Sequence, residues 1–511
     1  MTFKLSAFIA RAALATLILA APLCPAAQVF EIRQFGAVGD GKVADTAAIQ
    51  KAIEAASAAG GGTVNFSPGT YLSGSIRLKS HVKLHLEPGA TLLGSPQRFD
   101  YRKLNFYALV WADNETDIGI TGKGVIDGQG KILAKGYELP VTQGKWPDAR
   151  EGERPVIINF RNCQRVTMRD VTLRESACWV QLYRDCNDVS IENIKVRTMA
   201  AITNDGLDID GCKDVVVRGC DIDSEDDGIC LKSTRRACEN ILIENCRVRS
   251  SCNALKFGTA SFAGFKNIIC RNLELYDTYL SAMALELVDG GVMENVQITN
   301  VKITDCNNPL FLRLGHRNAD GLVGSVSNVS ISNVTAEIPN RPKSAMNKFP
   351  TVWQHRCQTL VTASITGQPG HPVRDVTLKD ISIVYGGIGA TQRTNHHHWA
   401  KLDEVPERAE SYPESTMFGV LPAWGFYLRH AEGIRFENVT LRTKAEDYRP
   451  AMVADGVRQL QVDNLQVKSA GKEPVIVLRD VQGATFTNTP VPPKSAPFIK
   501  TLGNTRNLSG S

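Results

Sequence analysis

Three aspartates lie about one sequence repeat apart and carry the side chains best suited to chemistry. Asp205 follows Thr203-Asn204, and Asp226 and Asp227 come 21 and 22 residues later. In a fold of stacked repeats, residues one repeat apart meet on one face. Carboxyl groups gathered in this way can serve as the acid and the base that cleave a glycosidic bond.

The elements that must position these aspartates are short strands that recur along the chain. Units that alternate polar residues with Val or Ile recur every 23 to 28 residues from Val166 to Val296, and resume from Val329 to Leu460. Asn, Asp and Gly separate the units, which is typical of strands joined by tight turns. The pattern predicts an all-β protein, a right-handed parallel β-helix (a solenoid) in which each repeat is one coil. The anchors of the units are Val166, Val189, Val215, Ile241, Ile268, Val296, Val329, Val376, Ile434 and Leu460.

The region before the repeats predicts a short capping helix. Asp45 can cap a helix with one apolar face, and the three glycines at 60–62 would end it. We expect this helix to cover the open end of the solenoid, where unpaired strand edges would otherwise be exposed. The apolar face consists of Ala48, Ile49, Ala52, Ile53 and Ala56.

The predicted organisation has three parts. Residues 1–27 resemble a secretory signal peptide, 28–95 form the capping region and first coils, and 96–500 form the catalytic β-helix. A polar insertion near 388–425, which includes His396, His397 and His398, interrupts the repeat. This insertion either walls a binding face or is a solvated loop.

Composition limits the partners. The formal charge of +5 falls to about +3 once Lys4 and Arg11 leave with the signal peptide, so nucleic acid is not an expected partner. We expect an exported monomer, periplasmic or extracellular, with no membrane insertion after the signal is removed.

The cysteines follow the repeat rather than a metal-binding pattern. Cys163, Cys186, Cys212 and Cys238 each lie three residues before a strand anchor, and Cys220, Cys246 and Cys270 form a second set. Their spacing predicts a ladder of small buried residues, with disulfides between them as the alternative. No Cys-x-x-Cys motif or histidine cluster accompanies them, so neither a metal site nor a cofactor is expected.

These features resemble glycoside hydrolase family 28, the polygalacturonase family of the pectin-lyase-like superfamily. The segment 35–41 (Phe-Gly-Ala-Val-Gly-Asp-Gly) is similar to the family's N-terminal motif. The family's Asn-Thr-Asp motif corresponds to Thr203-Asn204-Asp205, with the first two residues exchanged, and its Asp-Asp motif to Asp226-Asp227.

Two further family motifs are replaced. Asn253 stands where the family has the histidine of Gly-His-Gly. Glu286 stands where the lysine of Arg-Ile-Lys would bind a substrate carboxylate. Because an acid repels a carboxylate, galacturonate is not assured at the cleavage subsite.

The resemblance implies a role for each aspartate. Asp226 is the expected general acid, and Asp205 and Asp227 are expected to position and deprotonate the attacking water in an inverting mechanism. Lys256, Glu286 and Arg313 could equally form a structural ion pair, and we expect structural roles for Asp289 and His316. The expected substrate-binding residues are Asn204, Asn253, Lys256, Glu286, Arg313 and Trp179.

The sequence therefore predicts an exported glycoside hydrolase that acts on a pectic or related polysaccharide or oligosaccharide. A calcium-dependent lyase or epimerase is one alternative, with Asp226 and Asp227 as metal ligands and Lys256 as the base. A carbohydrate-binding β-helix without catalysis is another. A purely structural surface protein is the least favoured, because it would not need the acidic cluster.

Overall fold

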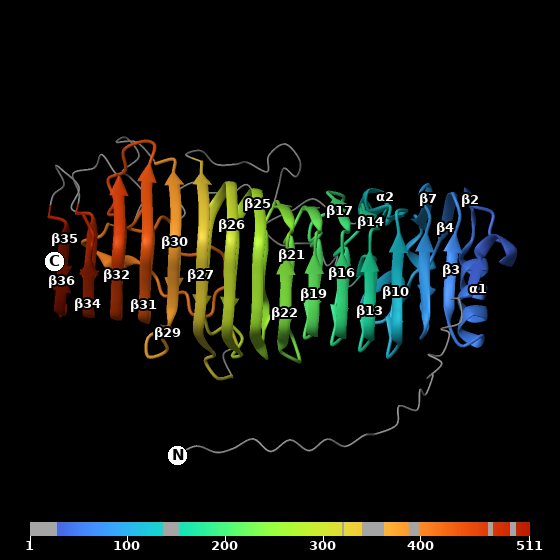
Figure 1. The fold of residues 1–511 in the computed structure, drawn as a ribbon, viewed down its shortest axis with the longest axis horizontal. Coiled ribbons are helices and arrows are strands. Elements are labelled where there is room, and N and C mark those ends of the chain that lie inside the picture. Colours follow the sequence, from blue (N-terminus) through green and yellow to red (C-terminus); the bar gives the residue numbers. More distant parts are fainter. Residues whose placement is uncertain are drawn as a thin grey trace, which may run out of the picture.

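The chain winds into an elongated stack of coils, with α1 at one end and the C-terminus at the other (Figure 1). The computed structural model describes residues 28–135, 153–318, 321–339, 362–387, 398–468, 474–490 and 497–510. The predicted signal peptide, and His396 and His397, lie outside the described residues. Strand pairing between coils is parallel, as a β-helix requires, and the predicted right-handed parallel β-helix is confirmed.

Three ladders of strands form the walls of the β-helix. The first contains β1 (Val29–Glu31), β3 (Gly62–Phe66), β6 (Val82–Leu86), β10 (Thr116–Gly122), β13 (Gln164–Arg169), β16 (Asn187–Glu192), β19 (Lys213–Arg218), β22 (Cys238–Glu244), β34 (Gln482–Thr487) and β36 (Arg506–Gly510). The second contains β2 (Asp40–Ala44), β4 (Gly69–Ser73), β7 (Ala90–Gly94), β11 (Val125–Asp127), β14 (Thr172–Arg174), β17 (Lys195–Thr198), β20 (Asp221–Ser224) and β23 (Arg247–Ser250). The third contains β5 (Ile76–Arg77), β9 (Tyr107–Asp113), β12 (Val156–Arg161), β15 (Gln181–Arg184), β18 (Leu207–Asp210), β21 (Ile229–Ser233), β24 (Leu255–Ser261), β28 (Ala363–Thr366), β33 (Ile476–Arg479) and β35 (Ile499–Leu502).

Longer strands continue around the corners from one ladder to the next. They are β25 (Gly264–Leu287), β26 (Val292–Leu314), β27 (Ser325–Ile338), β30 (Val376–Tyr385), β31 (Phe426–Thr443) and β32 (Met452–Lys468). Two short strands, β8 (Arg102–Lys103) and β29 (Val373–Arg374), pair with β9 and β31.

The register of the first ladder matches the sequence repeat. Val166 pairs with Val189, Val189 with Val215, and Val215 with Ile241. The predicted anchors are therefore direct neighbours in successive coils, which confirms the repeat as the unit of stacking.

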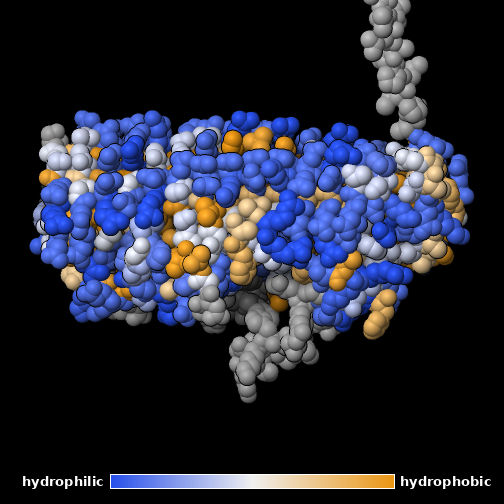
Figure 2. All heavy atoms as spheres, turned by 90° about the horizontal axis from the view of Figure 1, so that it is seen from below, coloured by the Kyte–Doolittle hydropathy of each residue, from blue (hydrophilic) through white to orange (hydrophobic). Residues whose placement is uncertain are grey.

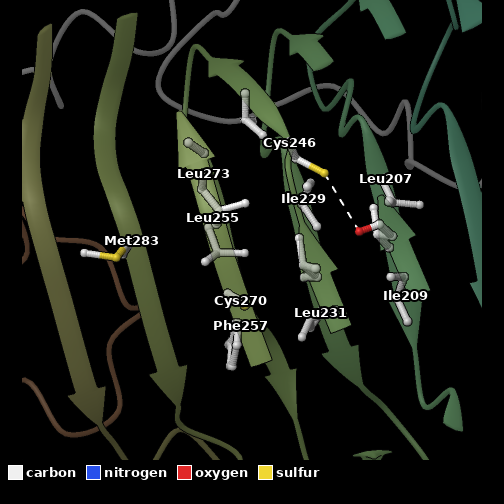
Figure 3. Close-up of a cluster of buried hydrophobic side chains, with 14 of the residues drawn as sticks. Leu207, Ile209, Ile229, Leu231, Cys246, Leu255, Phe257, Cys270, Leu273 and Met283 are labelled. Carbon is white, nitrogen blue, oxygen red and sulfur yellow. Dashed lines mark hydrogen bonds between the residues drawn. The ribbon is translucent and has the colours of Figure 1, made fainter. Parts of the chain in front are cut away.

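Rows of apolar side chains fill the space between the ladders (Figure 3). Leu207, Ile229, Leu255 and Met283 form one such row in the third ladder, each in register with the next and each buried. Each fully buried aliphatic side chain contributes about 1.5–3 kcal/mol to the stability of the folded state. These rows hold the polar residues at the strand starts in fixed positions.

Cysteines occupy the same interior. The seven cysteines of the predicted ladder, from Cys163 to Cys270, are buried and free, so the thiol ladder is confirmed for them and no disulfide joins them. Cys246, drawn in Figure 3, donates to the carbonyl of Val217 at 3.9 Å.

Asparagines stack at the turns. Asn267 donates to Asn240 at 3.1 Å, and Asn295 donates to Asn267 at 3.0 Å. These residues have φ between 56° and 58°, a left-handed conformation that Asn tolerates better than most residues.

The capping helix α1 (Thr46–Ala58) packs on β1 and β3, and its buried face is the one predicted. The predicted N-cap contact is wrong in detail. The Asp45 carboxylate accepts bonds from the backbone N–H groups of Val38 and Gly39 instead of from the first turn of α1. Asp45 therefore ties the preceding loop to the helix. A second, short helix, α2 (Gly130–Lys135), follows β11.

Most of the surface seen in Figure 2 is hydrophilic, with small scattered hydrophobic areas. Within the part of the chain that the structure describes, no helix is long and apolar enough to cross a bilayer.

Candidate active site

The three aspartates lie where strands of the third ladder begin. The N–H of Gly206 donates to the carbonyl of Asp227 at 2.8 Å, and the N–H of Gly228 donates to the carbonyl of Asn253 at 2.8 Å. Asp205, Asp227 and Asn253 therefore occupy equivalent places in three successive coils. The predicted gathering of the carboxylates on one face is confirmed.

Glycines after the aspartates allow the coils to approach closely. A Cβ atom at Gly206 would lie 2.8 Å from the carbonyl oxygen of Gly228, and one at Gly228 would lie 2.6 Å from that of Ala254. A larger residue at either place would push the coils apart exactly where the aspartates stack.

Buried polar side chains fix the turn that carries Asp205. The Asn204 side-chain oxygen Oδ1 accepts bonds from the Thr198 hydroxyl and from the backbone N–H groups of Ala200 and Ala201, and its side-chain nitrogen Nδ2 donates to the carbonyls of Ser176 and Cys178. Arg154, which the sequence reasoning missed, donates to the carbonyl of Ile202 and to Thr203. Asn204 was predicted to bind substrate, but its amide is engaged in holding this turn.

The three carboxylates are close together and nearly buried, with 4–8% of each residue exposed. Oxygens of Asp205 and Asp227 lie within 4.8 Å of each other, as do oxygens of Asp226 and Asp227. Two carboxylate oxygens at that separation can both bond to one water molecule, since each bond needs about 2.8 Å.

Lys232 is the cation next to Asp205. Its ammonium group lies 3.0 Å from Asp205, contacts Asp208, and lies 4.6 Å from the centre of the Trp179 ring. The sequence reasoning missed Lys232. The signal was available, because Lys232 pairs in register with Asp210, one repeat earlier on the same face as Asp208.

Lys256 is the cation next to Asp227. Its ammonium group lies 3.1 Å from Asp227, 3.7 Å from Glu286 and 3.8 Å from Glu414. Asn253 donates to the other oxygen of Asp227 from its side chain at 3.0 Å and from its backbone at 3.2 Å. Lys256 and Asn253 together hold Asp227 in place.

Glu414 comes from the insertion and was not predicted. It lies 3.5 Å from the Asn253 amide, across 161 residues of sequence. The ring of Tyr412, two residues earlier, lies 5.5 Å from the Lys256 ammonium group. For the residues described, the reading of the insertion as a wall of the site is therefore favoured over a solvated loop.

The groups around the three aspartates shift their pKa values in different directions. Burial, with the charges of Asp205 and Asp227, raises the pKa of Asp226 well above its usual value. Among the described residues, no lysine or arginine forms an ion pair with Asp226. Burial also acts on Asp227, but Lys256, Lys232 and the Asn253 bond outweigh it and lower the pKa of Asp227. Burial raises the pKa of Asp205 more than Lys232 lowers it.

The remaining predicted residues take less direct places. Arg313 is buried and donates to the carbonyls of Gly367, Glu407 and Arg408, so it holds the insertion rather than facing the aspartates. Asp289 is paired with Arg317 at 2.8 Å, as its expected structural role requires. Glu286 forms the predicted ion pair with Lys256, and Trp179 is 9% exposed against Phe106.

Two groups of side chains could in principle hold a metal ion. One contains Asp205, Asp227 and Cys230, and the other contains Asp226, Asp227 and Cys252. In the first group, Lys232 already lies 3.1 Å from the Cys230 sulfur and 3.0 Å from Asp205. A metal ion bound by Asp205, Asp227 and Cys230 would have to displace the Lys232 ammonium group, so this first group fits a metal ion poorly.

A protein-family model matches the part of the chain that contains the three aspartates. The model described as Glycosyl hydrolases family 28 matches residues 63–401.

Two curated relatives carry related names. An exo-poly-alpha-D-galacturonosidase of Dickeya chrysanthemi is 26% identical over 322 residues, covering 52% of this chain and 53% of that protein. A probable polygalacturonase of Vitis vinifera is 25% identical, covering 55% of this chain and 56% of that protein. The chain spans about half the length of the curated relatives it matches.

Two solved structures share the fold. The exopolygalacturonase of Thermotoga maritima has a TM-score of 0.55 at 23% identity and covers 70% of this chain and 87% of its own. The family 28 exopolygalacturonase of Yersinia enterocolitica has a TM-score of 0.53 at 18% identity and covers 94% of this chain and 78% of its own.

Proposed function

The chain belongs to glycosyl hydrolase family 28, and from this membership and the carboxylate cluster we propose that it hydrolyses a glycosidic bond in a pectic or related polysaccharide. The observation that carries the proposal is the division of charge between neighbours. No lysine or arginine that the structure describes pairs with Asp226, and burial raises its pKa, which favours the protonated acid, whereas Lys256 at 3.1 Å and Asn253 at 3.0 Å favour the ionised form of Asp227. Hydrolysis needs one group in each of these states.

The reaction begins with a water molecule between Asp205 and Asp227. Asp227 is the group more readily available in the ionised form that a base needs, because its pKa is lowered while that of Asp205 is raised. Asp205 orients the water with it. Asp226 protonates the leaving oxygen as the bond to the anomeric carbon breaks, and water attacks from the opposite face, which inverts the configuration.

The cations contribute by position. Lys232 and Lys256 keep negative charge tolerable in a buried site, and each is itself kept protonated by its carboxylate partners despite burial. We propose that the enzyme is exported, as its predicted signal peptide implies, and that it acts as a monomer. The names of its relatives make polygalacturonate the first substrate to try.

The test is hydrolysis of pectic, rhamnogalacturonan and neutral glycans by the wild type, Asp226→Asn and a matched control. We expect Asp226→Asn to lower kcat by about 10²–10⁴-fold. The control, Asp223→Asn, changes an aspartate on β20 that pairs with Arg249 and should leave kcat unchanged.

NMR of the first product distinguishes the mechanisms. Inverted anomeric configuration supports the proposal, and retained configuration contradicts the roles of Asp205 and Asp227. An ultraviolet-absorbing unsaturated sugar would indicate the lyase instead. A wild type that cleaves none of these glycans would contradict the proposed activity.

A further inference from the structure

The Tyr412 ring is the exposed aromatic surface next to the catalytic carboxylates. Tyr412 is 51% exposed, whereas Trp179, on the Lys232 side, is 9% exposed. The Tyr412 ring centre lies 5.5 Å from the Lys256 ammonium group and 5.7 Å from the Arg317 guanidinium carbon. An exposed ring with an electron-rich face suits the C–H groups of a pyranose.

The two cations that touch this ring are already neutralised. Lys256 is shared by Asp227, Glu286 and Glu414. Arg317 forms two hydrogen bonds to Asp289, at 2.9 and 2.8 Å. Both cations are therefore already paired with carboxylates of the protein, which weakens their attraction for a carboxylate on a substrate.

Acidic groups surround the same place. Glu414 stands beside Lys256 and Asn253, two residues along the chain from Tyr412. Glu286, which is fully buried, lies 3.7 Å from the same Lys256 ammonium group. A substrate carboxylate over Tyr412 would meet acids, and like charges in a partly buried site repel strongly.

We propose that the exposed ring of Tyr412, with the buried side chains of Glu414 and Lys256 beside it, is a subsite for a sugar residue that has no carboxylate, with the sugar ring stacked on Tyr412. The inference rests on the proposed function and narrows it, because a bond cleaved here joins a neutral residue on the Tyr412 side to the rest of the chain. A polymer of galacturonate alone would not fill this subsite well.

The test measures binding rather than turnover. The full-length Asp226→Asn protein is titrated with two oligosaccharides of equal length, an oligogalacturonide and its carboxyl-reduced form. We expect the reduced form to bind at least about tenfold more tightly. Equal or tighter binding of the oligogalacturonide would overturn the inference, and so would binding of neither.

Variants of the subsite sharpen the result. In the Asp226→Asn background, Tyr412→Ala should weaken binding of the reduced oligosaccharide by up to about tenfold, whereas Tyr412→Phe keeps the ring and should bind within about twofold. Glu414→Gln should reduce the factor by which the carboxyl-reduced oligosaccharide binds more tightly than the oligogalacturonide. If Tyr412→Ala and Tyr412→Phe bind alike, the ring is not the platform.

The two proposals fail in different ways. If the reduced oligosaccharide binds as expected but the wild type cleaves no glycan, the proposed hydrolysis fails while the subsite stands. If the wild type cleaves polygalacturonate and leaves uronates on both sides of the broken bond, hydrolysis stands and the neutral subsite fails.

Discussion

Asp226 and Asp227 are adjacent in the chain but meet different neighbours. The carbonyl of Asp226 accepts bonds from Ser224 and Ser250, which fixes its backbone, while no described cation pairs with its carboxyl group. Asp227 turns its carboxylate to Lys256 and Asn253. A buried carboxyl without a counter-ion destabilises a protein when it ionises, so Asp226 should carry a stability cost.

Asp226→Asn should therefore stabilise the fold while it removes activity. The raised pKa means that the folded state binds the Asp226 proton more tightly than the unfolded state does. The free energy of unfolding of the wild type should therefore fall as the pH rises above about 3.9, the pKa of an aspartate in the unfolded chain. We expect the free energy of unfolding of Asp226→Asn to exceed that of the wild type by about 1–2 kcal/mol at neutral pH, and the difference to vanish near pH 4.

Unfolding midpoints of the two proteins across this pH range check the expectation. Asp223→Asn, which loses a partly exposed ion pair, should be less stable than the wild type by at most about 1 kcal/mol. A stabilisation of Asp226→Asn that does not depend on pH would argue against a raised pKa.

Lys256→Met should move the acidic limb of the pH profile. Lys256 lowers the pKa of Asp227, so its loss raises that pKa, and a higher pH is needed before the base is ionised. The acidic limb of kcat/KM should shift upward by about 1–3 pH units. Lys266→Met, which removes an exposed lysine paired with Glu294, is the matched control. A uniform drop in kcat/KM without a shift would mean that Lys256 acts only on structure.

At the scale of elements, the insertion is the part that completes the site. Leu402, Val405, Phe418 and Leu421 pack in a separate apolar cluster with Phe311 of β26. From β26, Arg313 donates to the carbonyls of Glu407 and Arg408 in the insertion. These contacts carry Tyr412 and Glu414 to Lys256, so a distant element supplies two of the residues around the base.

Arg313→Met should loosen this segment and lower activity from a distance. The variant keeps the apolar stem but loses the bonds to the insertion, so hydrogen exchange in residues 398–425 should speed up by at least about tenfold. The expected loss is in kcat, because Glu414 no longer steadies Lys256 and Asn253. The control Arg374→Met, at an exposed arginine paired with Glu432, should change neither the hydrogen exchange in residues 398–425 nor kcat. A higher KM with unchanged exchange would instead support the predicted role of Arg313 in binding substrate.

The elements differ in how far the sequence predicts them. The strands repeat at 23 to 28 residues, and the spacing of 22 residues between Asp205 and Asp227 is close enough to this period to predict that they lie in neighbouring coils. Glu414 lies 161 residues from Asn253 and outside the repeat, so no local pattern connects the two. Asn204 resembles a substrate-binding motif, yet its five hydrogen bonds to the turn appear only when successive coils are in place.

For the whole molecule, the solenoid separates stability at its ends from chemistry in its middle. In the sequence the aspartates lie between β17 and β21, and Figure 1 shows these two strands well away from α1. Each coil contacts mainly its neighbours, so damage at one end should not alter the geometry at Asp226. The end itself remains vulnerable, because α1 is the described element that covers the outer side of the first coil, where no further coil is stacked among the described residues.

Ile53→Asp should therefore uncover that end without disabling the site. Ile53 lies on the buried face of α1, and a carboxylate there would undock the helix from β1 and β3. We expect the unfolding midpoint to fall, consistent with a loss of about 3–5 kcal/mol, and the exposed strand edges to promote association, seen as larger species by light scattering. The monomeric fraction should retain kcat, since the catalytic coils are intact. Lys51→Asp, on the exposed face of the same helix, should leave the midpoint and the monomer unchanged. A monomeric, equally stable Ile53→Asp would show that the cap does not protect this end, and a loss of kcat in the monomer would show that the coils are coupled along the solenoid.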